Sequence, residues 1–191
     1  TLMCASATSL HALRKSRLKG GETLAVFGAG GLGMSAIQLG RALGASDVYA
    51  VDINPAKLDL ARDLGAVPVN AGEGDPVEAI RKLTGGKGVD VALEVIGLPV
   101  TMSQALRSLN VFGRAVIVGI SEKPLEVDTY HHLLGPETEL IGSNDHLLQE
   151  LPQLVEFARR GVLDLSRIVT RTVPLEAGAI NAVMDLSLIH I

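Results

Sequence analysis

Three glycines, Gly28, Gly30 and Gly33, have the clearest chemical pattern in the chain, because they fit the spacing G-x-G-x-x-G. They follow an apolar run over residues 23–27, typical of a buried strand, and they precede a helical apolar pattern over residues 34–43. In that context the first glycine permits a tight turn, the second lets a pyrophosphate approach the backbone, and the third lets the helix pack against the sheet.

The same turn opens a helix, and the start of a helix attracts anions. The amides of Gly31 and Leu32 stand where unpaired N–H groups and the helix dipole favour a phosphate. Many glycine turns only connect two elements, and that is the alternative interpretation. Because this turn lies between a strand and a helix, it predicts dinucleotide binding.

An acidic residue, Asp52, ends the second apolar run, and its carboxylate can accept hydrogen bonds from the adenosine ribose 2′-hydroxyl. It also repels the 2′-phosphate of NADP, and Ile53 and Asn54 provide no arginine to offset that repulsion. We therefore expect NAD(H) as ligand, with NADH bound more tightly than NADPH. In the alternative interpretation Asp52 only caps the helix that begins near Pro55. Lys57, one turn into that helix, could reach the ribose or a phosphate, or could be an ordinary exposed lysine.

The alternation of strands and helices indicates how the chain positions these residues. Apolar runs and helical patterns repeat about every 25 residues, which is typical of right-handed βαβ units and a parallel sheet. The pattern predicts an α/β fold, a doubly wound six-stranded parallel sheet of the Rossmann type. After Gly161 the alternation lapses into a predicted strand, 167–173, and a helical segment, 175–186. The predicted strands of the sheet are 23–27, 47–51, 66–69, 89–96, 114–120 and 139–142, and its helices are 34–43, 55–64, 76–83, 100–109 and 147–160.

The composition supports this fold class and argues against other kinds of function. Hydrophobic residues make up 47% and aromatic residues 3% of the chain, which suits a sheet covered on both faces by helices. The net charge of −4, without a basic cluster, argues against nucleic acid as a partner. The apolar runs are far shorter than the roughly 20 residues that span a bilayer, so we expect no membrane partner. The single cysteine, Cys4, favours a reducing, cytoplasmic setting.

Four further motifs occur together with the glycine turn. They are Cys4-Ala5-Ser6-Ala7-Thr8, Val51-Asp52-Ile53-Asn54, Glu94-Val95-Ile96-Gly97 and Val116-Ile117-Val118-Gly119. In combination they resemble the zinc-dependent alcohol dehydrogenases of the medium-chain dehydrogenase/reductase family. The resemblance covers residues 2 to about 185 and implies a catalytic domain that precedes this chain.

The resemblance implies a division of the chain into segments. Residues 1–19 would form a connecting helix from the preceding catalytic domain, and residues 20–165 the NAD-binding Rossmann domain. Residues 166–185 would begin the return to the catalytic domain. The last six residues, 186–191, could be translated from a sequencing adapter, and we expect them to be an artefact.

The resemblance also implies a role for each matching residue. Cys4 would be the third protein ligand of a catalytic zinc whose other ligands, a Cys and a His, lie in the preceding domain. A lone cysteine is otherwise most often a small buried hydrophobe. Thr8 would be the catalytic candidate and would pack beside the nicotinamide ring. The other matches are the pyrophosphate turn (Gly28, Gly30, Gly31, Leu32 and Gly33), the adenosine-ribose site (Asp52, Ile53 and Lys57) and the strand ends that line the nicotinamide pocket (Ile96, Val118 and Ile120).

The activity that the resemblance implies is NAD-linked hydride transfer from a small alcohol, giving an aldehyde or ketone, with NAD and zinc as cofactors. The chain by itself would lack two zinc ligands and the proton relay, and we expect it to be inactive. A zinc-free quinone or enoyl reductase of the same superfamily, or a non-catalytic NAD-sensing module, are the alternatives. Family members commonly pair their sixth strands, so we expect a homodimer or homotetramer through residues 140–143.

Four other patterns are predicted not to form sites. Residues 85–88, Gly-Gly-Lys-Gly, lack the Ser or Thr of a phosphate loop and precede a strand, so they predict a turn. The pairs His131-His132 and Asp145-His146 have no second cysteine or nucleophile motif beside them, and we interpret them as solvated loop residues. His11 could lie at the edge of an active site, but a helix-surface histidine is the interpretation we favour.

Overall fold

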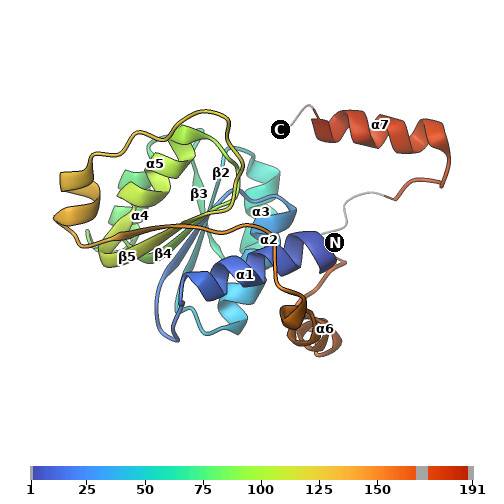
Figure 1. Ribbon diagram of the computed structural model, residues 1–191, viewed down its shortest axis with the longest axis horizontal. Coiled ribbons are helices and arrows are strands. Elements are labelled where there is room, and N and C mark those ends of the chain that lie inside the picture. Colours follow the sequence, from blue (N-terminus) through green and yellow to red (C-terminus); the bar gives the residue numbers. More distant parts are fainter. Residues whose placement is uncertain (1, 167–171, 189–191) are drawn as a thin grey trace.

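A six-stranded sheet in the order β3-β2-β1-β4-β5-β6 forms the centre of the protein (Figure 1), for which a computed structural model describes residues 2–166 and 172–188. All neighbouring strands pair in parallel. The order reverses beside β1, as in a doubly wound sheet, so the predicted fold class is confirmed. The strands are β1 (Leu24–Phe27), β2 (Val48–Asp52), β3 (Val67–Asn70), β4 (Val89–Glu94), β5 (Leu109–Ile117) and β6 (Glu139–Gly142).

Helices connect the strands and cover both faces of the sheet (Figure 1). Three of them begin with a proline, which suits the first helical turn because its missing N–H would have no partner there. The helices are α1 (Ala7–Lys15), α2 (Gly31–Ala42), α3 (Pro55–Asp63), α4 (Pro76–Leu83), α5 (Pro99–Arg107), α6 (Leu151–Arg159) and α7 (Ala177–Leu188). Short helical turns occur at η1 (Leu2–Ser6), η2 (Tyr130–Leu134) and η3 (Leu148–Glu150). Among the described residues no helix is long and apolar enough to span a membrane.

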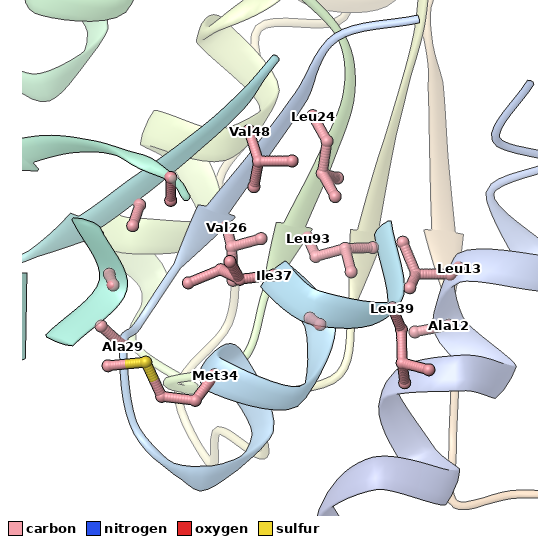
Figure 2. Packing of buried hydrophobic residues seen from close by; sticks show 14 of the residues in the cluster. Ala12, Leu13, Leu24, Val26, Ala29, Met34, Ile37, Leu39, Val48 and Leu93 are labelled. Carbon is pink, nitrogen blue, oxygen red and sulfur yellow. The ribbon is translucent and has the colours of Figure 1, made fainter. Parts of the chain in front are cut away.

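The central strand β1 is buried along its whole length, because α1 and α2 cover one face of it and α4 and α5 the other. Val26 points toward α2 and α1, where it joins a cluster with Ile37 and Leu13 (Figure 2). Phe27 belongs to a second cluster on the other face, with Ile80 of α4. Each of these side chains contributes about 1.5–3 kcal/mol by its burial. The strand therefore gives a rigid base to the turn that follows Phe27.

The predicted boundaries differ most from the structure at β5. This strand begins at Leu109, inside the helix predicted to run to residue 109, and it ends at Ile117 instead of residue 120. The main-chain oxygen of Glu94 accepts from the amide of Val118, as the ladder requires, and also from the amide of Gly119, so the regular pairing does not continue past this point. The predicted strand 167–173 falls mostly outside the described residues, whereas the predicted helix 175–186 corresponds to α7, which stands apart from the sheet in Figure 1.

A strained residue, Phe112, lies in the irregular first half of β5. Its φ angle is +62°, and its side chain is 65% exposed. A side chain in this left-handed conformation costs roughly 1–2 kcal/mol that glycine does not incur. We expect Phe112→Gly to raise the free energy of unfolding by about 1 kcal/mol in urea titrations. The exposed neighbour Val111→Gly is the matched control and should lower it; destabilisation by Phe112→Gly would contradict this account.

A buried carboxylate, Glu150, fixes α1 to the segment after β6, and this corrects the interpretation of His11 as a helix-surface residue. The side chain of Glu150 is 2% exposed, and that of His11 is 15% exposed. The carboxylate lies 3.1 Å from Nδ1 of His11, and it accepts hydrogen bonds from Arg14 at 3.0 Å and from the amide of Leu147 at 2.9 Å. The sequence could not show this, because Glu150 and His11 are 139 residues apart.

The Glu150 contacts predict a pH dependence of stability. Burial by itself raises the pKa of Glu150, but hydrogen bonds from the Leu147 amide, His11 and Arg14 outweigh burial and lower that pKa below its ordinary value of 4.5. A carboxyl group with a lowered pKa stabilises the fold above its unfolded pKa, and this contribution is lost as the pH falls through the folded one. We therefore expect the free energy of unfolding to fall more steeply from about pH 5 to pH 3 in wild type than in Glu150→Gln.

Urea unfolding at several pH values in this range tests the Glu150 prediction. The control is Glu176→Gln, since Glu176 is exposed, and this variant should follow the wild-type curve. Parallel curves for wild type and Glu150→Gln would show that Glu150 is not the group responsible.

Candidate functional site

A cleft lies at the carboxyl ends of β1, β2 and β4, where the strand order reverses. Its volume of about 390 Å³ is within the range of small-molecule sites. Ligands of doubly wound sheets bind at this switch point. The cleft is lined by Phe27, Gly28, Gly30, Gly31, Leu32, Gly33, Val51, Asp52, Ile53, Lys57, Ala71, Val95, Ile96, Leu98, Thr101 and Gln104.

Two glycines of the turn are required by close approaches of the backbone. Gly28 has a φ angle of +106°, and a Cβ atom there would lie 2.7 Å from Cγ1 of Ile96. At Gly33 a Cβ atom would lie only 1.8 Å from the main-chain oxygen of Gly28. The turn can therefore fold back onto the first turn of α2 only if both positions lack a side chain.

Gly30 differs from these two, because a Cβ atom there would meet no other atom within 4 Å. It lies just before α2, and no side chain caps that helix. The first amides of a helix have no partner within it, and the helix dipole adds positive potential at this end. The open space over Gly30 and the uncapped start of α2 thus form a cradle that fits a phosphate group.

The carboxylate of Asp52 connects the glycine turn to the end of β2. Its Oδ2 accepts a hydrogen bond from the amide of Ala29 at 2.8 Å, and its Oδ1 accepts one from the amide of Asn54 at 2.9 Å. The ammonium of Lys57 lies 3.9 Å from Oδ2. A carboxylate has about four acceptor sites, so those not used by the backbone can accept ribose hydroxyls. The cap of α3 is Asn54, whose side chain accepts from the amide of Ala56 at 3.0 Å, so the interpretation of Asp52 as that cap is wrong.

The walls of the cleft are apolar on both sides of Asp52. Ile53 is 72% exposed and Ile96 is 43% exposed, and both line the cleft. Apolar side chains at this exposure beside a carboxylate suit a flat base attached to a polar ribose. Ile96 was expected in the nicotinamide pocket, but the structure places it in the same cleft as the predicted adenosine-ribose residues and apart from Val118 and Ile120, which do not line this cleft.

The α5 wall of the cleft was missed by the sequence analysis. The cleft is also lined by Leu98, which is the N-cap residue of α5, and by Thr101 and Gln104 in its first two turns. Their spacing of three residues would place them on one face of a helix that begins at the carboxyl edge of the sheet. That spacing was the available signal. Four further residues of the lining have a sequence pattern typical only of core or strand-end positions. They are Phe27, Val51, Ala71 and Val95.

Four predicted site residues lie outside the lining of this cleft. Cys4 is an exposed free cysteine on η1, and Thr8 is buried on α1 with 7% exposure. Val118 and Ile120 follow the end of β5, and Ile120 is 87% exposed. The roles predicted for these four residues stay predictions.

No group of three or more His, Cys, Asp or Glu side chains within residues 2–166 and 172–188 is placed to hold a metal ion. Cys4 could therefore serve as a zinc ligand only together with residues from outside this part of the chain. Residues 85–88 form a turn between α4 and β4, as predicted. His131 lies on η2 and not in a loop, and its exposed ring pairs with Asp128 at 2.8 Å. His146 pairs with Asp145 at 2.6 Å, and its side chain is only 13% exposed, so it is not the solvated residue that we predicted.

The sequence of this chain is similar to those of several known dehydrogenases. (R,R)-butanediol dehydrogenase of Bacillus subtilis strain 168 is 38% identical over 174 residues, which are 90% of this chain and 49% of that protein. An alcohol dehydrogenase of Geobacillus stearothermophilus is 34% identical over 96% of this chain and 52% of its own length. The chain therefore spans about half the length of these relatives.

Solved structures of dehydrogenases are also similar to this chain in fold. The crystal structure of 2R,3R-butanediol dehydrogenase from Bacillus subtilis has a TM-score of 0.82 at 36% identity, over 88% of this chain and 48% of that one. A zinc-binding dehydrogenase of Sinorhizobium meliloti 1021, solved bound to NADP, has a TM-score of 0.83 at 29% identity, over 88% and 50%. Residues 31–160 match the family described as zinc-binding dehydrogenase. The chain belongs to this family of zinc-binding dehydrogenases.

Proposed function

We propose that this chain is the coenzyme-binding half of an NAD-linked alcohol or polyol dehydrogenase. The observation that carries the proposal is the cleft in which an uncapped helix start and Asp52 lie side by side. In this arrangement the pyrophosphate of NAD rests over Gly30 at the start of α2. The hydroxyls of the adenosine ribose donate hydrogen bonds to the carboxylate of Asp52, and the adenine base lies between the apolar side chains of Ile53 and Ile96.

The reaction needs residues beyond the cleft. Thr8 and the residues that follow β5, Val118 and Ile120, would hold the nicotinamide ring. Hydride transfer between the alcohol carbon and the nicotinamide ring is the chemistry of the cofactor, and the chain contributes binding and orientation. Cys4, as a thiolate, would be one ligand of a zinc ion, which would supply Lewis-acid polarisation of the alcohol oxygen when bound.

Metal analysis of the complete protein tests the catalytic part of this proposal. We expect wild type to contain zinc and to oxidise alcohols with NAD, whereas Cys4→Ser should lose the catalytic zinc and nearly all turnover but still bind NADH. The control is Ala5→Ser, a neighbouring substitution in η1 that leaves the thiol in place. Equal zinc content and turnover in wild type and Cys4→Ser would contradict the role of Cys4, and turnover by a wild-type protein without zinc would favour a zinc-free reductase.

A further inference from the structure

Glu94 is a fully buried carboxylate at the edge of the coenzyme cleft, and no step described so far uses it. It is the last residue of β4, with Phe27 of β1 beside it on one side and Ile117 of β5 on the other. Its relative exposure is 0%, and it is not among the residues that line the cleft. Burial of a charged group is costly unless hydrogen bonds compensate for the lost water. The hydrogen-bond partners of Glu94 therefore show which parts of the structure its carboxylate holds in place.

One oxygen of the Glu94 carboxylate holds the wall of the cleft. Oε1 accepts hydrogen bonds from the amides of Ile96 at 3.0 Å and Gly97 at 2.9 Å, and from the hydroxyl of Thr101 at 2.7 Å. Ile96 and Thr101 both line the cleft, the first from the loop after β4 and the second from α5. This single oxygen thus ties the loop to the first turn of the helix.

The other side of Glu94 faces the segment after β5. Its main-chain oxygen accepts from the amides of Val118 at 2.8 Å and Gly119 at 3.1 Å. Its buried Oε2 has no hydrogen-bond partner among the described residues, and a Cβ atom at Gly119 would lie 2.7 Å from it. A Cβ atom at Gly97 would lie 2.2 Å from the main-chain oxygen of Ile120. The loop that Glu94 holds is therefore packed directly against residues 118–120.

We propose that Glu94 is a positioning residue that couples the cleft wall at Ile96 and Thr101 to the segment Val118–Ile120. Charge-assisted hydrogen bonds are roughly twice as strong as neutral ones, so the carboxylate fixes the loop after β4 more firmly than a neutral side chain of the same shape. Because the loop is packed against Val118–Ile120, loosening it loosens that segment as well. The proposal rests on the proposed function only for the ligand, since the coupling is a property of the free protein.

Amide hydrogen exchange of the ligand-free complete protein, followed by mass spectrometry, tests this coupling. We expect Glu94→Gln to accelerate exchange about tenfold in segment 95–98 and also in segment 117–120. The second segment is decisive, because Val118 and Gly119 bond to the main-chain oxygen, which the substitution retains. The matched control is Glu150→Gln, which alters a carboxylate of 2% exposure and should leave both segments unchanged. Acceleration confined to segment 95–98, or none, would overturn the proposal.

A second pair of variants keeps the test valid if Glu94→Gln does not fold. Thr101→Val removes one donor to the carboxylate, and Thr84→Val removes a hydroxyl of the same type that accepts from the amide of Gly88, far from the cleft. Thr101→Val should accelerate amide exchange in both segments, whereas Thr84→Val should change the exchange rate of neither. If Thr101→Val leaves segment 117–120 at the wild-type rate, the coupling does not exist.

Binding measurements on the same proteins separate this inference from the proposed function. We expect the dissociation constant for NADH to rise about fivefold in Glu94→Gln, with little change in Glu150→Gln. Failure of the wild-type protein to bind NADH would refute the proposed function, while the exchange data would still decide the coupling. NADH binding that is unchanged in Glu94→Gln, despite faster exchange in both segments, would show that the coupling does not set the shape of the cleft.

Discussion

Gly33→Ala is expected to lose both stability and NADH binding, whereas Gly30→Ala should lose binding alone. A Cβ atom at position 33 would lie 1.8 Å from the oxygen of Gly28, so the turn and α2 must move apart. Such overpacking costs about 2–3 kcal/mol, and displacement of the phosphate cradle by about 1 Å should weaken binding roughly a hundredfold. At Gly30, by contrast, a Cβ atom would meet no protein atom within 4 Å. It would occupy the space proposed for the pyrophosphate.

Urea unfolding and NADH titration of the two glycine variants separate these effects. Gly30 has φ −84° and ψ −161°, an extended conformation that alanine adopts readily, so its stability should stay within about 0.5 kcal/mol of wild type. Gly178→Ala, in a helix and with open space around it, is the control and should bind NADH as wild type does. Tight NADH binding by Gly30→Ala would show that the pyrophosphate does not rest on this turn.

The second large effect is expected at Asp52, which should decide between NADH and NADPH. The wild-type protein should bind NADH at least about tenfold more tightly, a difference of about 1.4 kcal/mol. In the proposed complex its carboxylate would accept hydrogen bonds from the ribose hydroxyls and would repel a 2′-phosphate. Asp52→Asn would remove that repulsion, and Lys57, which lies 3.9 Å from Oδ2 of Asp52 in the wild type, could then pair with the phosphate. We expect the preference to fall to about threefold or less, mainly because NADPH binds more tightly.

Parallel titrations of NADH and NADPH measure this preference. Asp52→Asn keeps an acceptor for one of the two amides that Asp52 holds, at Ala29 and Asn54, so the turn should remain formed. The control is Asp59→Asn on α3, because Asp59 pairs with Arg62 and does not line the cleft. Equal binding of NADH and NADPH by the wild-type protein would contradict the role of Asp52. An unchanged preference for NADH in Asp52→Asn would contradict it as well.

The fold could be predicted well from the sequence because the local apolar pattern and the positions of prolines match the strands and helices of the parallel sheet. Apolar runs buried on both faces mark the strands, and Pro55 and Pro76 mark where two helices begin. The left-handed turn at Phe112 has no such marker, since a phenylalanine there gives no sign of a positive φ angle. The boundaries of β5 were therefore the least accurate.

The candidate site was predicted only where a local motif carries it. The glycine turn and Asp52 have chemistry and spacing that a single sequence displays, and the structure places them in one cleft. The contacts of Glu94 with Thr101 and with the segment after β5 depend on how strands and helices pack, and the same holds for the pair of His11 and Glu150. Neither the packing nor the direction of a buried side chain can be read from spacing alone.

Equilibrium titration of NADH, followed by its fluorescence, tests most directly whether the cleft beside the glycine turn binds NAD(H). We expect saturable binding to the complete wild-type protein, with one site per chain, and the loss of this binding in Gly30→Ala. Absence of saturable binding to a folded wild-type protein, or equal binding by Gly30→Ala, would contradict this expectation.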